Sequence, residues 1–141
     1  MKKYLSFIAS TSFLLAAFSP NLSAAELTVD VSNIQQVQGS LYISLYKDEQ
    51  GFNANTNFVK REKVNVDKNT LQIKLGDLPA GDYALKTYQD VNDNGKLDFN
   101  GMLPSEPYGS SSKSKELAPP GFTDAKFTLD SNRTIQIQLL K

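Results

Sequence analysis

The chain has 141 residues, with 15 basic and 15 acidic side chains and with neither cysteine nor histidine. Those absences exclude Ser-His-Asp and Cys-His catalysis, histidine metal sites and stabilisation by disulfides. Because the charges balance, the chain has no basic footprint of the kind that binds nucleic acid, and we expect no nucleic-acid partner.

The N-terminal residues have the three parts of a signal peptide. Lys2 and Lys3 give a basic start, an apolar stretch follows over residues 4–18, and small residues stand at 23–25. A segment that crosses a bilayer needs about 20 apolar residues, and this stretch is shorter. We therefore expect residues 1–25 to form a cleavable signal helix rather than a membrane anchor.

Cleavage is expected after Ala25 or, as the nearest alternative, after Ala24, because small residues precede both bonds. The remaining residues 26–141 are enough for a single domain and carry a net charge near −2, since two lysines leave with the signal. We predict a periplasmic or secreted protein with no transmembrane segment after cleavage.

Beyond the signal, apolar residues alternate with polar ones at a period of two, which is typical of strands with one buried face. The pattern predicts seven strands, over residues 27–31, 41–46, 58–66, 71–75, 83–88, 127–129 and 135–139. No segment shows a helical stripe. Seven short strands of this kind predict an all-β, seven-stranded antiparallel sandwich, immunoglobulin-like or transthyretin-like.

The turn before the fifth predicted strand supports this architecture. Pro79 and Gly81 favour a turn, and Tyr83 then enters the strand. Its hydroxyl is placed to bond back to the turn, as in the tyrosine corner of immunoglobulin-like domains. The alternative is an ordinary core tyrosine that follows a turn.

One long loop, over residues 90–124, interrupts the pattern. Loops longer than about 15 residues in a compact domain are commonly functional or flexible. The second part of this loop, at 110–115, is rich in serine and lysine and favours flexibility. Its first part holds the one group of side chains suited to binding an ion or to catalysis.

That first part has the spacing of a calcium loop of EF-hand type, in which alternate residues turn oxygens toward one ion. Gly95 stands where the sharp turn is needed, and Asp93 falls between ligand positions, where we expect it to face water. The candidate metal ligands are Asp90, Asn92, Asn94, Lys96 through its backbone carbonyl, Asp98 and, from further along the chain, Glu106.

The loop departs from the EF-hand pattern at its twelfth position, where Gly101 replaces the bidentate glutamate. Glu106 lies five residues later and is the candidate replacement, although Pro104 and Pro107 constrain its path. With two or three carboxylates, we expect weak calcium affinity, on the order of 10⁻⁴ to 10⁻³ M. The alternative is that Asp-Asn-Gly is a hairpin turn whose Asx side chains cap their own backbone, with no metal.

Four motifs, taken in order, resemble the family of small secreted bacterial proteins called domain of unknown function two-one-four-one. They lie at 78–84 (LPAGDYA), 90–98 (DVNDNGKLD), 104–109 (PSEPYG) and 119–125 (PPGFTDA). The resemblance covers essentially the whole chain after the signal. It implies a periplasmic or secreted β-sandwich of a Gram-negative bacterium and no established activity.

The function we expect is that of an exported, non-catalytic module, whose loop binds calcium and presents a surface to a glycan or an envelope protein. The loop holds or borders four aromatic residues, which form a stacking platform or pack the loop onto the sandwich: Tyr88, Phe99, Tyr108 and Phe122.

Two alternatives come from other classes of protein. A small glycan-acting enzyme would draw a pair of carboxylates from Asp90, Asp98 and Glu106, as glycoside hydrolysis requires. An envelope structural or assembly component would pair an exposed strand edge with a partner.

Overall fold

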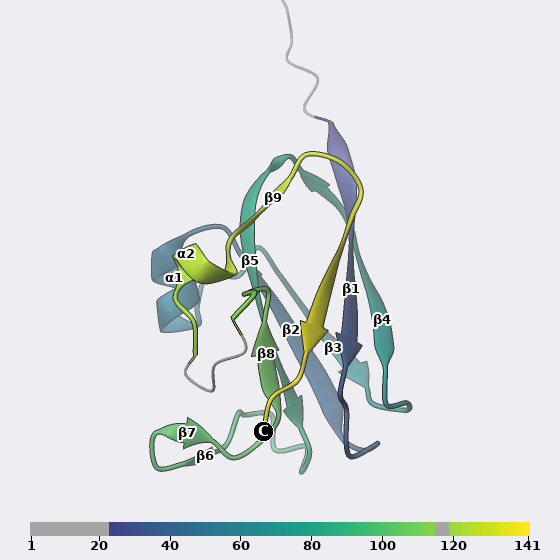
Figure 1. Ribbon diagram of the computed structural model, residues 1–141, viewed down its shortest axis with the longest axis vertical. Coiled ribbons are helices and arrows are strands. Elements are labelled where there is room, and N and C mark those ends of the chain that lie inside the picture. Colours follow the sequence, from purple (N-terminus) through teal and green to yellow (C-terminus); the bar gives the residue numbers. More distant parts are fainter. Residues whose placement is uncertain (1–22, 115–118) are drawn as a thin grey trace, which may run out of the picture.

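The computed structural model describes residues 23–114 and 119–141 (Figure 1). The apolar stretch of the predicted signal peptide lies outside the described residues. Within the described part, no helix has the length and apolar character that a membrane crossing requires. The first strand begins at Ala24, so both candidate cleavage sites lie at the start of a strand, where Ala24 pairs with Pro79 and Ala25 with Leu78.

The protein is mostly β, and its longer strands form two sheets around one core (Figure 1). The smaller sheet has the order β10-β1-β4, from strands β10 (Arg133–Gln138), β1 (Ala24–Ser32) and β4 (Leu71–Pro79). The larger sheet has the order β3-β2-β5-β8, from strands β3 (Lys60–Asn65), β2 (Ser40–Tyr46), β5 (Gly81–Asp90) and β8 (Tyr108–Ser110), and β9 (Phe127–Leu129) also pairs with β5.

Each of the seven predicted strands overlaps a strand of the structure, while three further strands lie inside the predicted loop. These are β8 and the small hairpin of β6 (Phe99–Asn100) and β7 (Leu103–Pro104). They were not predicted because β6 and β7 span two residues each, and β8 (Tyr-Gly-Ser) lacks the apolar-polar-apolar alternation of β9 (Phe-Thr-Leu). The strand pairs are antiparallel apart from β1 and β10, which run parallel.

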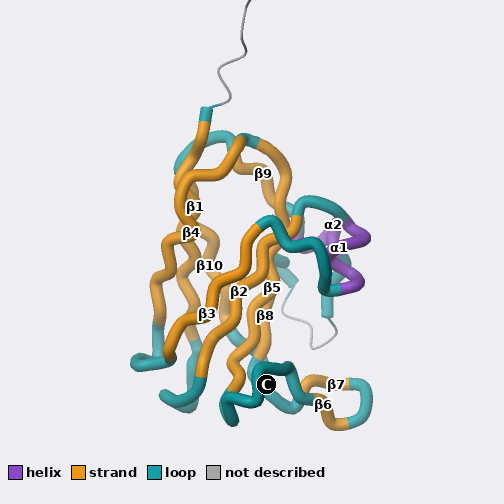
Figure 2. Tube along the Cα trace, turned by 180° about the vertical axis from the view of Figure 1, so that it is seen from behind, coloured by secondary structure: helices purple, strands orange, loops and turns teal. Residues whose placement is uncertain are grey.

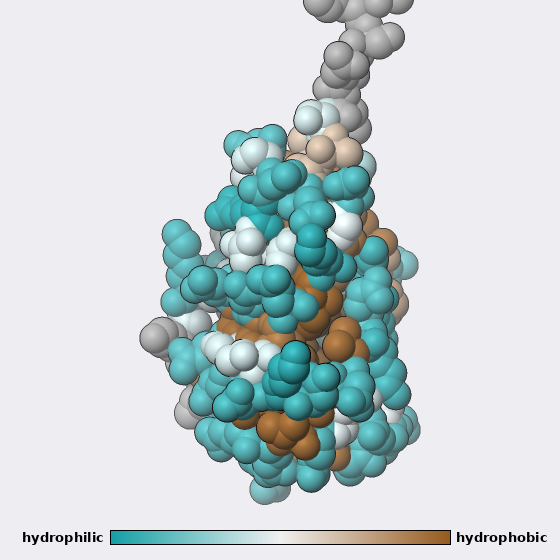
Figure 3. Space-filling view, turned by 90° about the vertical axis from the view of Figure 1, so that its right-hand side faces the viewer, coloured by the Kyte–Doolittle hydropathy of each residue, from teal (hydrophilic) through white to brown (hydrophobic). Residues whose placement is uncertain are grey.

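The core follows from the period-two pattern, because alternate side chains of a strand point to the same face. Strands of both sheets contribute to a single cluster of buried apolar side chains, which includes Leu27, Val29 and Val31 of β1, Leu41, Ile43 and Leu45 of β2, and Ile135 and Ile137 of β10. On the side where β4 lies, hydrophilic residues cover most of the surface and hydrophobic ones show in patches (Figure 3).

The tyrosine corner is confirmed. Tyr83 is 1% exposed, and its hydroxyl donates a hydrogen bond to the carbonyl of Pro79 at 2.7 Å. This bond links the strand β5 to the turn that precedes it.

Two short helices, which the sequence did not predict, lie beside β5 (Figure 2). In α1 (Glu49–Ala54), the side chain of Asp48 caps the N-terminus by accepting the N–H of Gly51 at 2.7 Å. In α2 (Phe122–Ala125), Phe122 packs edge-on against Phe52, with ring centroids 5.7 Å apart. Helices of four and six residues are too short to show a helical stripe.

Candidate functional site

The loop begins at Asp90, the last residue of β5, which is fully buried at 0% exposure. Its two carboxylate oxygens accept backbone N–H groups of the residues that follow, Oδ1 from Asn94 at 3.0 Å and Oδ2 from Gly95 at 2.7 Å. Gly95 has a φ of 80°, which glycine adopts without the strain that a Cβ would cause. Asp90 therefore folds the loop back over the end of β5.

Asn92 and Asn94 form two successive Asx turns inside the loop. Oδ1 of Asn92 accepts the N–H of Asn94 at 3.1 Å, and Oδ1 of Asn94 accepts the N–H of Lys96 at 2.9 Å. Both side-chain amides donate to the Asp98 carboxylate, at 2.8 Å from Asn92 and at 2.9 and 3.0 Å from Asn94. The bonds from Asn94, and then that from Asn92, lower the pKa of Asp98.

Glu106 closes the loop from the opposite side and is 6% exposed. Its Oε1 accepts the N–H of Val91 at 2.8 Å, and its Oε2 accepts the N–H of Asp98 at 3.1 Å. The N–H of Ser105 donates to the carbonyl of Asp98 at 2.8 Å. The chain therefore does bring Glu106 back to the loop, despite the prolines on both sides of it.

Val91 connects the two buried carboxylates. It follows Asp90 in the chain and donates its N–H to Glu106. Neither carboxylate forms an ion pair with any described residue, and their hydrogen bonds come from backbone N–H groups. A buried negative charge is costly without a positive partner, and two near each other are more so.

Asp93 lies in the same loop but points away from it. Its Oδ1 accepts a hydrogen bond from the Ser40 hydroxyl at 2.7 Å and lies 4.0 Å from the Lys63 ammonium. The expectation that Asp93 simply faces water is therefore only half met, since its side chain is 55% exposed yet contacts β2 and β3.

The six candidate ligands thus fall into two arrangements. The side chains of Asn92, Asn94 and Asp98 contact one another, while Asp90 and Glu106 hold the backbone of the same loop. Lys96 contributes its N–H to the second Asx turn. Within residues 23–114 and 119–141, no three acidic side chains come together as a ready metal site.

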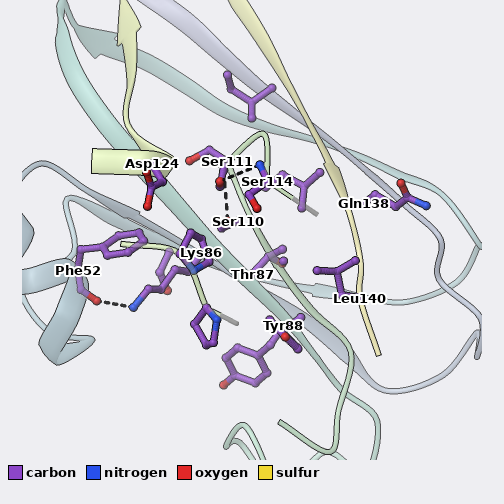
Figure 4. Close-up of a pocket in the computed structure, with 18 of the residues that line it drawn as sticks. Phe52, Lys86, Thr87, Tyr88, Ser110, Ser111, Ser114, Asp124, Gln138 and Leu140 are labelled. Carbon is purple, nitrogen blue, oxygen red and sulfur yellow. Dashed lines mark hydrogen bonds between the residues drawn. The ribbon is translucent and has the colours of Figure 1, made fainter. Parts of the chain in front are cut away.

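Sequence reasoning missed a large hollow of about 1520 Å³ beside β5 (Figure 4). Its walls include Lys86 and Thr87 of β5, the segment 110–114, Asp124 of α2, and Gln138 of β10. The hydroxyl of Thr87 is buried without a hydrogen-bond partner in the described chain. The Ser111 hydroxyl is not free for chemistry, because it accepts the N–H of Leu85 at 2.8 Å and donates to the carbonyl of Ala125.

Lys86 is the charged side chain of this hollow whose pKa is affected by burial. Its ammonium lies 4.1 Å from the ring centroid of Phe52 and donates to the Phe52 carbonyl (Figure 4). Burial lowers the pKa of Lys86. The sequence places Lys86 within the alternating strand 83–88. The contact with Phe52 was not predictable, because the helix α1 that carries Phe52 was not predicted.

The four loop aromatics do not form one platform. Tyr88 stacks on Tyr42, with centroids 5.0 Å apart and planes at 10°, while Phe122 packs on Phe52. Tyr108 is bridged to Leu140 through its backbone, and Phe99 remains 59% exposed. Tyr88 therefore packs within the larger sheet, Phe122 joins α2 to α1, and the backbone of Tyr108 is tied to the C-terminal segment.

Together, these features define a small, mostly β protein with an Asp/Asn-rich loop that is closed by a buried glutamate. Residues 29–137 match the family described as "Uncharacterized protein conserved in bacteria (DUF2141)", and the chain belongs to this family. The four sequence motifs lie within the matched range. Comparisons with curated proteins and with solved structures gave no match.

Proposed function

We propose that this chain is an exported, non-catalytic binding module, whose loop at residues 90–106 takes up calcium and thereby holds a surface for a glycan or envelope protein. The observation that carries the proposal is the pair of buried carboxylates, Asp90 and Glu106, in one oxygen-rich loop, neither of them in an ion pair with a side chain of the described residues. A divalent cation would supply the missing positive charge.

The chemistry of the loop suits calcium, which prefers six to eight oxygen ligands in flexible geometry. Asp98 is the accessible carboxylate, and the amide oxygens of Asn92 and Asn94 lie within two bonds of the nitrogens that already contact it. Rotation of these amides would replace their three hydrogen bonds to Asp98, and the two Asx-turn bonds that their oxygens now accept, with two ligand oxygens. An affinity on the order of 10⁻⁴ to 10⁻³ M would suffice outside the cytoplasm, where calcium is plentiful.

The fold that we propose for the module is an immunoglobulin-like or transthyretin-like sandwich. Its support is one apolar core shared by the two sheets and the tyrosine corner at Tyr83. The proposed location is the periplasm or the medium, on the strength of the signal-like pattern over residues 1–25.

The alternative of a glycan-acting enzyme has less support. Glycoside hydrolysis needs two carboxyl groups that can reach the sugar. Both oxygens of Asp90 and of Glu106 accept backbone N–H groups, which leaves Asp98 as the accessible member of the three.

The alternative of an assembly component has one observation in its favour. Strand β10 lies at the edge of its sheet, and its residues from Thr134 to Gln138 carry no charge. Edges of natural sheets are commonly protected by charged residues, prolines or bulges.

The calcium proposal is tested by thermal unfolding of the purified protein in EDTA and in 5 mM calcium chloride. An ion held at 5 to 50 times its dissociation constant stabilises the folded state by about 1–2 kcal/mol, which raises the melting temperature by several degrees. Asp98→Asn should abolish this rise. Asp93→Asn, which removes the same charge from the same loop but outside the ligand set, should keep it.

A calcium-induced rise that is equal in both variants would indicate general screening of charge and would contradict the proposal. The absence of any rise in the unmodified protein would contradict it as well.

A further inference from the structure

The hairpin of β6 and β7 carries three large apolar side chains into solvent. Phe99 is 59% exposed, Met102 is 94% exposed and Leu103 is 51% exposed. The hairpin projects sideways from the two sheets, as the two opposite views show (Figures 1 and 2). The largest apolar patch of a soluble protein is often functional.

The hairpin is a formed element rather than a loose loop. Phe99 pairs with Pro104 and Asn100 with Leu103, and Gly101 makes the turn with a φ of 66°. At its base, the carbonyl of Asp98 accepts the N–H of Ser105, and the buried carboxylate of Glu106 holds the N–H of Asp98. The three apolar side chains are therefore presented at a fixed place on the molecule.

The apolar side chains lie on both faces of the hairpin. Cross-strand partners share a face, and neighbours along a strand alternate. Phe99 and Pro104 thus belong to one face, Leu103 belongs to the other, and Met102 stands at the turn between them. A lipid phase contacts both faces and the tip of such a hairpin at once, which suits this distribution.

The exposed area also favours lipid over a protein partner. Aromatic side chains bury about 150–250 Å² each, so one partly exposed phenylalanine and two somewhat smaller side chains expose on the order of 400 Å² together. A specific protein interface takes about 800 Å² from each partner. Shallow insertion needs less, because apolar groups enter the headgroup boundary by about 5–10 Å, and two residues of strand span about 7 Å.

We propose that the hairpin at residues 99–104 inserts tip-first into the interfacial layer of a lipid bilayer, with Met102 deepest. This inference goes beyond the proposed function, because insertion of the apolar tip requires neither calcium nor a glycan or protein partner.

The chain contains no tryptophan, so a single one reports on its own surroundings. Met102→Trp in the otherwise unmodified protein is titrated with phosphatidylcholine vesicles, in EDTA and again in calcium. We expect a blue shift of the emission and protection from an aqueous quencher, both growing with lipid concentration. The matched control is Val59→Trp, at an apolar position of similar kind that is 44% exposed just before β3, and it should show neither change.

Vesicle sedimentation tests the tip without a reporter. Met102→Glu should lower the vesicle-bound fraction at least about fivefold, while Val59→Glu should leave it unchanged; near-wild-type circular dichroism melting shows that both variants fold. Absence of a lipid-dependent shift for Met102→Trp would overturn the inference. An equal shift for Val59→Trp would overturn it too, because it would reflect adsorption of the whole surface. A response in EDTA stands even where calcium gives no thermal stabilisation, so the two proposals fail separately.

Discussion

The carboxylate of Glu106 accepts the backbone N–H of Val91 at 2.8 Å, across 15 residues of chain, and with its other oxygen it accepts the N–H of Asp98. One side chain thus ties the start of the loop to the base of the β6–β7 hairpin. The candidate ion site and the exposed apolar tip share this support, so their positions depend on the same buried group.

Glu106→Gln should destabilise the protein by about 1–3 kcal/mol, because the amide can accept one N–H but turns its NH₂ toward the other. Urea unfolding measures the change. The control is Glu62→Gln, whose carboxylate is 39% exposed and lies 3.4 Å from Lys60, where an ion pair contributes about 0–1 kcal/mol. An equal loss in both variants would show that Glu106 does not act as a tie.

Tyr83→Phe should cost about 1 kcal/mol, because the ring keeps its place in the core while the Pro79 carbonyl loses its donor. Tyr88→Phe removes a hydroxyl that accepts from Arg61 at 3.2 Å at the surface, and it should cost clearly less. Equilibrium unfolding of the two variants side by side tests the corner. A similar small cost for both would mean that the corner bond adds nothing to stability.

The carboxyl of Asp98 should titrate below the ordinary aspartate range, because hydrogen bonds from Asn94 and Asn92 lower its pKa. A folded-state pKa below the unfolded one contributes stability above the unfolded pKa, about 3.9, and this is lost as pH falls through the folded value. Carbon-detected NMR titration follows the group directly. Asn94→Ala should raise its midpoint more than Asn92→Ala does, and the reverse order would contradict the assignment of causes.

Proline should be tolerated at one position of β10 and should destabilise the protein at the next. Leu139 donates its N–H to Ser32 of β1, while Leu140 donates to Tyr108 on the other side, so N–H groups alternate in direction along the strand. Gln136 therefore points its N–H outward and Ile137 points its N–H to β1. Gln136→Pro should be tolerated to within about 1 kcal/mol, as at other sheet edges.

Ile137→Ala gives the cost of the lost side chain alone. Ile137→Pro should destabilise the protein by about 1–3 kcal/mol more than that, because it also breaks a ladder hydrogen bond. Thermal and urea unfolding measure all three variants. If Gln136→Pro is as damaging as Ile137→Pro, the parallel register of β1 and β10 is wrong.

Much of the fold was predictable, because apolar and polar residues alternate with a period of two along a half-buried strand. Leu27, Val29 and Val31 alternate with polar neighbours and all lie in the core. The turn at Pro79 and Gly81 and the hydrogen bond of Tyr83 were predictable too, since they involve residues close together in the chain. The two helices and the strands β6 and β7 were not, because each is too short to show a period, and β8 was not because Tyr-Gly-Ser does not alternate apolar with polar residues.

The features of the candidate site also divide into those that the sequence predicts and those that it does not. The Asx turns of Asn92 and Asn94 follow from local spacing, and the structure contains them. The exposure of Met102 at the tip of a projecting hairpin had no local signal, because it depends on what the rest of the chain leaves uncovered.

The sequence by itself determined the strand segments, the tyrosine corner, the oxygen-rich spacing after Asp90 and membership of the family. Each of these depends on neighbours within a few residues, whose preferences are set by side-chain alternation and turn chemistry. The tertiary structure alone decided that β1 pairs in parallel with β10, that Glu106 returns to bond Val91, and that Lys86 meets Phe52. Those contacts join residues distant in the chain, and they form only when packing of the two sheets brings them together.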